Sequence, residues 1–447
     1  MNTQFVFEGK QKTVLLSLML LGLVCLGITW AVDDEFHTRF WTNLLHNSVF
    51  FTGISAVSLF LITAGITMYG GWATVFKRVW ESYSLFMIVG MVLLGIIAIG
   101  NVTHMHHLYH WADSEAVAKD KILTGKSSFL NNTWYMIATF VFLGAWFLFA
   151  YKLRQLSLRE DVDGNYEKGD FSIHRSMRKY AAAFLPIFGF TSAAAIWLWV
   201  MSIDAHWFST LFAWYCTASL VVSMVCVTIL ILLYLKSQGY MDYVTKEHFH
   251  DLGKYTFAFS IFWTYLWFSQ FMLIWYANLG EETVYFNLRM KQYPVLYWGN
   301  LIMNFVLPFL ILIRNDTKRK FGSIGFAAGL VLFGHWWDFF QMIKPGAYKN
   351  MQEHVEHMAH TGGAHEAAQH GHEATAGAEH AVATGHEAVQ HAATFVEGFT
   401  IPGLLELGTF LGFGAMFVYF VFLQLSKASL LPKNDPYIQE SLAHHVM

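Results

Sequence analysis

Ten long apolar stretches dominate this chain of 447 residues and constrain its fold more than any other feature. Each is close to the ~20 residues that an α-helix needs to cross the hydrocarbon core of a bilayer. Charged residues make up only 13% of the chain, whereas soluble domains carry about 25%. The sequence therefore predicts an all-α membrane protein of about ten transmembrane helices. They fall near residues 13–32, 45–69, 83–101, 134–153, 181–203, 207–235, 255–278, 295–313, 322–340 and 401–424.

Lysine and arginine are distributed unevenly between the two sets of loops. The termini and the alternate loops hold 20 of the 28 basic residues, and the opposite loops hold 8. Basic residues are retained on the cytoplasmic side of a membrane. We therefore expect both termini in the cytoplasm.

The chain is expected to have four parts. Residues 1–343 hold the first nine transmembrane helices, residues 400–425 the tenth, and residues 426–447 a cytoplasmic tail. Residues 344–399 are rich in histidine, alanine and glutamate, with His-Glu-Ala triplets that begin at His365, His372 and His386. Low complexity and few large apolar side chains predict a solvated, partly helical or disordered arm, which the orientation above places in the periplasm.

A weak internal repeat relates the spans. The second and sixth begin on the outer side with His46 and His206, and the fifth and ninth end there with Asp204 and Asp338. This pattern predicts two parallel four-helix bundles, made of spans two to five and six to nine, with spans one and ten at their flank.

Most ionisable side chains of the spans lie in the outer third of the bilayer. Charged groups at that depth are costly, face the bundle interior and often mark the path of a proton, ion or substrate. The alternative is that they cap helix ends or extend to the interface. His335 and Asp338 are three residues apart and therefore share a helix face. The candidates for a proton path are Asp204, His206, His335, Asp338 and Glu406.

The seventh span mixes aromatic rings with hydroxyl groups. Its polar side chains Ser260, Thr264, Tyr265 and Ser269 are candidates to carry a water chain inward. A quinone head group also suits such a wall, because rings stack on it and polar groups bond its carbonyls. The candidates for this contact are Tyr265, Trp267 and Gln270. Ordinary helix packing, in which hydroxyls bond back to the backbone, is the alternative.

The cysteines and histidines do not form an evident cofactor site. Cys25, Cys216 and Cys226 lie in apolar stretches without a Cys-x-x-Cys pair, and the inner side lacks a second histidine pair for a two-haem wire. Histidines of the arm are five apart, whereas the zinc-protease motif needs four. We therefore expect no metal or cofactor held by this chain. The net charge of −3 gives no sign of a nucleic-acid partner.

Three stretches resemble a known family of membrane subunits. They read MSIDAHWFST at 201–210, HDLGK at 250–254 and FSQFMLIWYAN at 268–278. They are similar to the second large polysulfide-reductase-type membrane subunit of bacterial alternative complex III, most closely over spans five to eight. The run WYANLGEE at 275–282 is the most specific piece. The histidine arm is not part of the family pattern.

The resemblance implies a subunit of a respiratory complex in the bacterial inner membrane. Such a complex oxidises menaquinol or another quinol and passes the electrons to cytochrome c or to a terminal oxidase. Haem c and iron–sulfur clusters belong to partner subunits. The implied partners are a multihaem cytochrome c, an iron–sulfur protein, a sister quinol-binding membrane subunit, small membrane and lipid-anchored subunits, a haem-copper terminal oxidase, and phospholipid.

Three functions remain open for this chain. The first is a cofactor-free scaffold of that complex that also conducts protons. The second is a quinol-binding subunit with its own pocket. The third is a stand-alone secondary transporter, whose repeats would look similar.

Overall fold

The computed structural model of the protein describes residues 4–164, 169–369 and 395–444, and for residues 357–369 the backbone alone. Within these ranges the chain is all-α, without strands. Nine helical segments of the described chain are long and apolar enough to cross a membrane. They are α1 (Gly9–Val32), α2 (Thr38–Thr67), α3 (Lys77–Ser84) with α4 (Met87–Val102), α7 (Asn132–Asp163), α8 (Ser172–Trp199), α9 (Leu211–Ser237), α10 (Lys246–Ala277), α12 (Pro294–Leu301) with α13 (Leu307–Leu312), and α17 (Leu404–Leu425).

The predicted ninth span forms the first part of a much longer helix, α15 (Phe321–Gln369). This segment carries His335 and Asp338, whose polarity lowers its hydropathy, although both side chains are fully buried. Residues 344–369 of the predicted arm continue the same helix. The triplets at His372 and His386 lie outside the described residues.

The helices pack as the internal repeat predicts. One bundle consists of α2, α3–α4, α7 and α8, and the other of α9, α10, α12–α13 and α15. Helix α2 joins the two bundles by packing on both α9 and α15, and α1 pairs with α17 at their flank. The prediction of an all-α membrane fold, with two four-helix bundles and two flanking helices, is confirmed.

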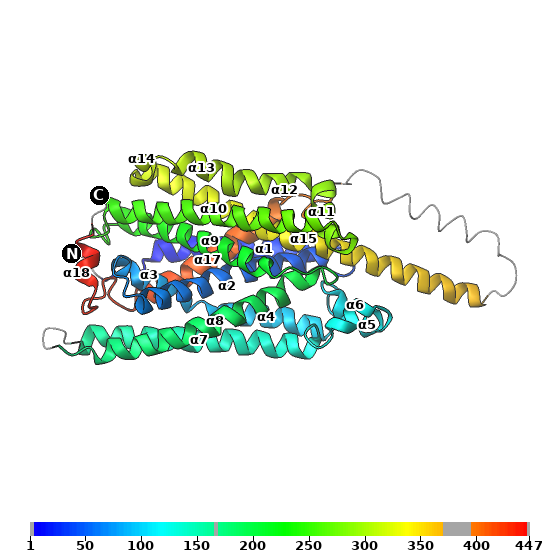
Figure 1. Ribbon diagram of the computed structural model, residues 1–447, viewed down its shortest axis with the longest axis horizontal. Coiled ribbons are helices and arrows are strands. Elements are labelled where there is room, and N and C mark those ends of the chain that lie inside the picture. Colours follow the sequence, from blue (N-terminus) through cyan, green and yellow to red (C-terminus); the bar gives the residue numbers. More distant parts are fainter. Residues whose placement is uncertain (1–3, 165–168, 370–394, 445–447) are drawn as a thin grey trace.

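The elongated molecule has two distinct ends (Figure 1). Both termini lie at one end, together with α14 (Asn315–Arg319) and α18 (Ile438–Leu442). The far part of α15 projects from the opposite end, where α5 (Ser114–Lys119), α6 (Lys121–Lys126) and α11 (Gly280–Gln292) also lie. Following the predicted orientation, we call these the inner end and the outer end.

Helices α1 and α17 approach each other closely where both present glycine. A Cβ built on Gly22 would lie 2.5 Å from the Cα of Gly412, and one built on Gly412 would lie equally close to Gly22. Glycine at both positions lets the two backbones touch, as small residues do in membrane helix pairs. The first and last spans therefore form one unit.

The third span begins earlier than predicted. It starts at Thr74 rather than near Tyr83, and this extension brings Lys77, Arg78 and Glu81 into the bundle. Hydropathy excludes these charged residues from a predicted span, but in the structure opposite charges from other elements balance them. The sequence boundary was wrong for this reason.

Candidate functional site

Asp338 is the centre of a polar cluster inside the second bundle. Its carboxylate is fully buried and accepts hydrogen bonds from the hydroxyl of Tyr215 on α9, from Trp263 Nε1 on α10 at 2.9 Å and from Asn300 Nδ2 on α12 at 2.7 Å. Each neighbouring helix thus contributes one donor. A buried carboxylate without donors would be prohibitively costly. No ion pair in the described part of the chain involves Asp338, so it has donors but no contacting cation.

The donor Asn300 is itself held in place by amide groups. Its Nδ2 also donates to Gln341 Oε1 at 2.8 Å, and its Oδ1 accepts from Asn304 Nδ2 at 2.6 Å. Asn304 lies in a π-helical turn, Ile302–Val306, and donates to the carbonyl of Gly334 at 2.9 Å. Such turns in α-helices occur frequently at functional sites. Here the turn fixes the amide that faces Asp338.

His335 lies one turn before Asp338 on the same face of α15. Its Nδ1 bonds the Ser219 hydroxyl at 2.9 Å, and its Nε2 is buried without a partner among the described residues. The imidazole stands edge-on to the ring of Trp263, at 5.6 Å between centroids. His46 does not join this cluster through its side chain, because its Nε2 donates to the carbonyl of Trp336 at 2.8 Å.

A continuous series of contacts leads from Asp338 to the outer end. Gln341, which holds Asn300, also accepts a hydrogen bond at its backbone carbonyl from Arg289 Nε at 3.2 Å. Arg289 is fully buried, and its Nη2 pairs with Asp204 Oδ2 at 2.9 Å. Asp204 lies where α8 ends, and its side chain is 13% exposed. The series therefore joins a buried carboxylate to one at the surface.

Asp204 faces a cavity of about 310 Å³ at the outer end. A second cavity of about 590 Å³ lies beside it and shares part of its lining. Both are far larger than the space that one water molecule needs. Histidines make up much of the wall of this second cavity, which includes His104, His106, His107, His110, His206 and His354.

His206 belongs to this outer wall rather than to the Asp338 cluster. Its Nε2 bonds Asp120 Oδ2, and its side chain is 44% exposed. The hydrogen bond from His206 is the main reason that the pKa of Asp120 is lowered from its ordinary value.

Glu406 belongs neither to the Asp338 cluster nor to the outer wall with His206. It anchors α17 to α2. Its carboxylate accepts two hydrogen bonds from Arg39, at 2.7 and 2.9 Å, one from Asn43 at 3.0 Å, and one from the backbone of Gly403 at 3.0 Å. The Nζ of Lys344 donates to the carbonyl of Arg39 at 3.4 Å. A cation and several donors thus balance Glu406. The five predicted path residues consequently form separate groups, of which the Asp204 and Asp338 groups are linked.

The candidates on α10 divide between two faces of the helix. Ser260, Trp267 and Gln270 share the buried face with Trp263, whereas Tyr265 is 63% exposed on the opposite side. Thr264 lies between these faces and donates to the carbonyl of Ser260 at 2.8 Å, and Ser269 is half-buried. The buried face follows the 3.6-residue period of a helix, so helical spacing separates the two sets.

A charged network at the inner end has no counterpart among the predicted sites. Lys77 pairs with Asp435 of the C-terminal tail at 2.8 Å, and Glu81 accepts from both Arg78 and Arg154 at 2.8 and 2.9 Å. The only sequence signal is Arg78 and Glu81 at a spacing of three. Burial alone would raise the pKa of Asp435, but the charge and hydrogen bond of Lys77 outweigh it and lower the pKa.

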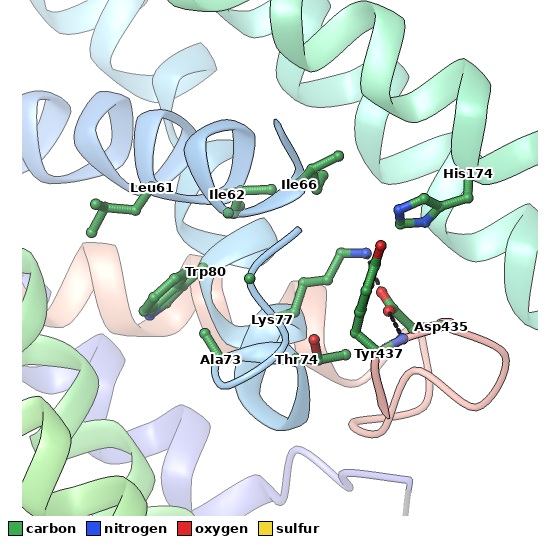
Figure 2. A pocket seen from close by; sticks show the side chains of 12 residues that line it. Leu61, Ile62, Ile66, Ala73, Thr74, Lys77, Trp80, His174, Asp435 and Tyr437 are labelled. Atoms are coloured by element: carbon green, nitrogen blue, oxygen red, sulfur yellow. Dashed lines mark hydrogen bonds and ion pairs between the residues drawn. The ribbon is translucent and has the colours of Figure 1, made fainter. Parts of the chain in front are cut away.

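Figure 2 shows the small cavity beside this network, with a volume of about 40 Å³. In this view Lys77, Asp435 and Tyr437 lie close together, with His174 of α8 above Asp435, and the apolar side chains of Ile62 and Ile66 at the end of α2 lie above Lys77. His174 Nδ1 bonds Glu160 at 3.1 Å, and its Nε2 has no partner in the described structure. The cavity has space for one or a few water molecules beside these polar groups.

The C-terminal tail closes the inner end over this cavity. Asn434 donates to the carbonyl of Asp161 at 3.0 Å, and the Ser441 hydroxyl donates to the carbonyl of Trp72 at 2.7 Å. His444 bonds Asp251 of α10 at 2.7 Å. The tail thereby connects the inner ends of both bundles.

Within the described residues, no group of three or more His, Cys, Asp or Glu side chains is arranged to hold a metal ion. No family model matches the chain, and no curated protein matches it. The chain is a multi-pass membrane protein, and the link from buried Asp338 to Asp204 at the outer end is the feature that bears most on its function.

Proposed function

We propose that this chain is an integral membrane subunit of a respiratory quinol:electron-acceptor oxidoreductase of the alternative complex III type. In that complex it serves as a cofactor-free scaffold and conducts protons toward the outer face. The three resembling stretches support the family. Two of them belong to the region of the polar series. Asp204 itself lies in the stretch 201–210, and α10, which carries Trp263, ends in the stretch 268–278.

The proton-conducting role rests on one observation, the buried carboxylate of Asp338 without a contacting cation. Ionisable groups inside membrane bundles commonly mark proton paths. Asp338 accepts a proton in the bundle, and water that enters along the amides of Asn300 and Gln341 carries the proton toward the outer cavity. Arg289 keeps its own proton. Its role is to hold Asp204 at the outer cavity, where water receives the proton.

Buried serine hydroxyls line the proposed inner half of the path. Ser260 is buried beside Trp263, and its hydroxyl has no hydrogen-bond partner among the described residues. Ser219 and Ser223 are also buried on α9, with Ser223 donating to the carbonyl of Ser219. Protons from the inner end reach Asp338 along these hydroxyls when water enters between them.

The test is the substitution Asp338→Asn in the assembled complex. The amide keeps the shape of the side chain and removes the titrating group, so the subunits and the haem content should be unchanged. Proton release per electron, or quinol oxidation, should fall about tenfold or more in reconstituted vesicles, as loss of a proton-transfer group predicts. Asp316→Asn, at an exposed position on α14, is the matched control. Unchanged turnover and proton release in Asp338→Asn would refute conduction through this cluster.

One observation favours a second candidate function, that of a quinol-binding subunit. Trp267 Nε1 and Gln270 Nε2, one turn apart on α10, are buried donors without partners among the described residues. A quinone carbonyl would accept from either group. Gln270→Leu should then raise the KM for quinol while leaving the kcat unchanged, and an unchanged KM would argue against a pocket here.

A further inference from the structure

An apolar cavity of about 350 Å³ lies at the outer end, beside the cavity that Asp204 faces. It is enclosed by residues that precede α7, by the end of α8 and by the segment that leads into α9. Its walls are mainly aromatic and aliphatic, and include Phe129, Leu130, Trp197, Met201, Trp207 and Phe208. This volume is within the range of small-molecule sites.

Hydrogen-bond donors in the wall of this cavity lack acceptors. Trp197 Nε1 and Trp207 Nε1 are both buried without a partner in the described part of the chain, and only 4% of Trp207 is exposed. Buried indole N–H groups usually find a partner. Both nitrogen atoms are closed off from the cavity in this conformation, so a ligand that brings acceptor oxygens would meet them after a small shift of the indole rings.

A cation lines the same cavity. Lys126 Nζ donates to the carbonyls of Ala205 and His206, at 2.7 and 3.3 Å, which leaves one of its three protons free. The same ammonium lies 5.5 Å from the ring centroid of Phe208, a side chain that is 57% exposed. One positive charge and two neutral donors together match a phosphate and an ester carbonyl.

The depth of the cavity matches the head-group region of a bilayer. It lies where two membrane-spanning helices end and begin, and Trp214, 65% exposed, lies one turn further into the apolar length of α9. Tryptophan and lysine are typical at this level, where indole rings meet lipid head groups. The apolar walls then face the upper part of an acyl chain.

We propose that this cavity binds one glycerophospholipid of the outer leaflet, with its phosphate at Lys126 and its ester carbonyls at Trp197 and Trp207. The phosphate and the ester carbonyls of a phospholipid only accept hydrogen bonds, so they suit a wall of donors better than a quinol, whose hydroxyls also donate. This inference depends on the membrane-spanning fold and not on the proposed respiratory function.

The lipid site also adjoins the outer part of the polar series. The Trp207 ring stacks on Tyr285 at 3.9 Å with an interplanar angle of 12°. The guanidinium of Arg289, which pairs with Asp204, lies over the same Tyr285 ring, 3.5 Å from its centroid. A bound lipid that fixes Trp207 therefore helps to position Arg289.

The test is native mass spectrometry of the protein purified in mild detergent, delipidated and then titrated with phosphatidylglycerol or phosphatidylcholine. We expect one tightly retained phospholipid per chain. The paired substitution Trp197→Phe and Trp207→Phe keeps the rings and removes both donors, so it should weaken binding by about tenfold. Trp214→Phe, in the same region but outside this cavity, should bind as the wild type does.

Three results would overturn the site. They are equal lipid retention in the paired variant and the control, no retained phospholipid in the wild type, and a bound mass that corresponds to a quinone. If the paired variant unfolds, Trp197→Phe and Lys126→Gln give the same comparison separately, because Trp197 does not share the stack with Tyr285. The measured quantity is bound lipid mass, so failure here leaves the Asp338 test of the proposed function unaffected.

Discussion

At the scale of single residues, two buried carboxylates of the outer half have opposite surroundings. Glu406 is balanced by Arg39, whereas Asp338 is surrounded by neutral donors. An ion pair with a guanidinium favours the charged form of a carboxylate, so such a group does not readily take up a proton. We therefore propose a structural role for Glu406 and place the proposed proton-conducting role at Asp338.

This difference predicts how the Arg39–Glu406 pair responds to substitution. Arg39→Ala leaves Glu406 buried without its cation, which should destabilise the protein by about 3 kcal/mol. The double variant Arg39→Met, Glu406→Met should recover much of that loss, since neither charge remains. Thermal unfolding in detergent measures both effects. If Arg39→Ala unfolded at the same temperature as the wild type, the pair would not anchor α17.

At the scale of elements, the C-terminal tail is held by charges that respond to pH. The pKa of Asp435 is lowered in the folded state, so its pairing with Lys77 stabilises the tail at all pH values above the ordinary aspartate pKa of about 3.9. That stabilisation is lost as the pH falls through the lowered pKa. Asp161 and Asp251 also hold this tail, through hydrogen bonds to Lys433 and His444.

The tail should accordingly detach when Asp435 is neutralised by mutation. Asp435→Asn is expected to lower the hydrogen-exchange protection of residues 433–442 at pH 7, relative to their intrinsic exchange rates, to the value that the wild type shows only in strong acid. Glu440→Gln, at an exposed tail position, serves as the control. Equal protection in Asp435→Asn and the wild type would show that other contacts suffice.

The α1–α17 pair makes a second prediction at this scale. Gly412→Leu forces a side chain into the backbone of Gly22, and overpacking of this kind costs about 1–3 kcal/mol. Gly27→Leu is the matched control on α1, because nothing lies within 4 Å of its Cβ position. Only the first variant should lower the unfolding temperature in detergent. Equal effects of both would show that the close approach is unimportant.

The sequence predicts the elements better than the contacts between them. Apolar length locates the spans, and the positions of His46, His206, Asp204 and Asp338 indicate the bundles. Hydropathy cannot show that Lys77 is buried, because its partner Asp435 is more than 350 residues away in sequence. For the same reason, the link from Asp338 through Arg289 to Asp204 is not predictable from their shared depth. Arg289 belongs to a loop helix that a search of the spans omits.

At the scale of the whole molecule, the distribution of charge predicts the orientation in the membrane. A cysteine at Val355, 43% exposed on the outer part of α15, should react with an impermeant maleimide once the outer membrane of the cell is permeable. A cysteine at Val162, 82% exposed at the inner end, should react only after the inner membrane is lysed. Background labelling should be low, because the native cysteines are buried. The opposite pattern would reverse the orientation.

Co-purification with other proteins distinguishes a subunit of a complex from a stand-alone transporter. Purification of the tagged chain in mild detergent should bring with it a multihaem cytochrome c and an iron–sulfur protein, visible as haem absorbance in the eluate. A chain that elutes alone and transports a solute in vesicles would establish the transporter instead.

The pairing of α1 with α17 has a consequence for how the protein is made. The ribosome produces the first span long before the last, and nearly 400 residues separate Gly22 from Gly412. During that interval the close-packing face of α1 has only lipid or the insertion machinery to cover it. We expect α17 to dock late in biogenesis, before the C-terminal tail closes the inner end, and premature stop codons before Leu404 to leave a chain that quality-control proteases remove.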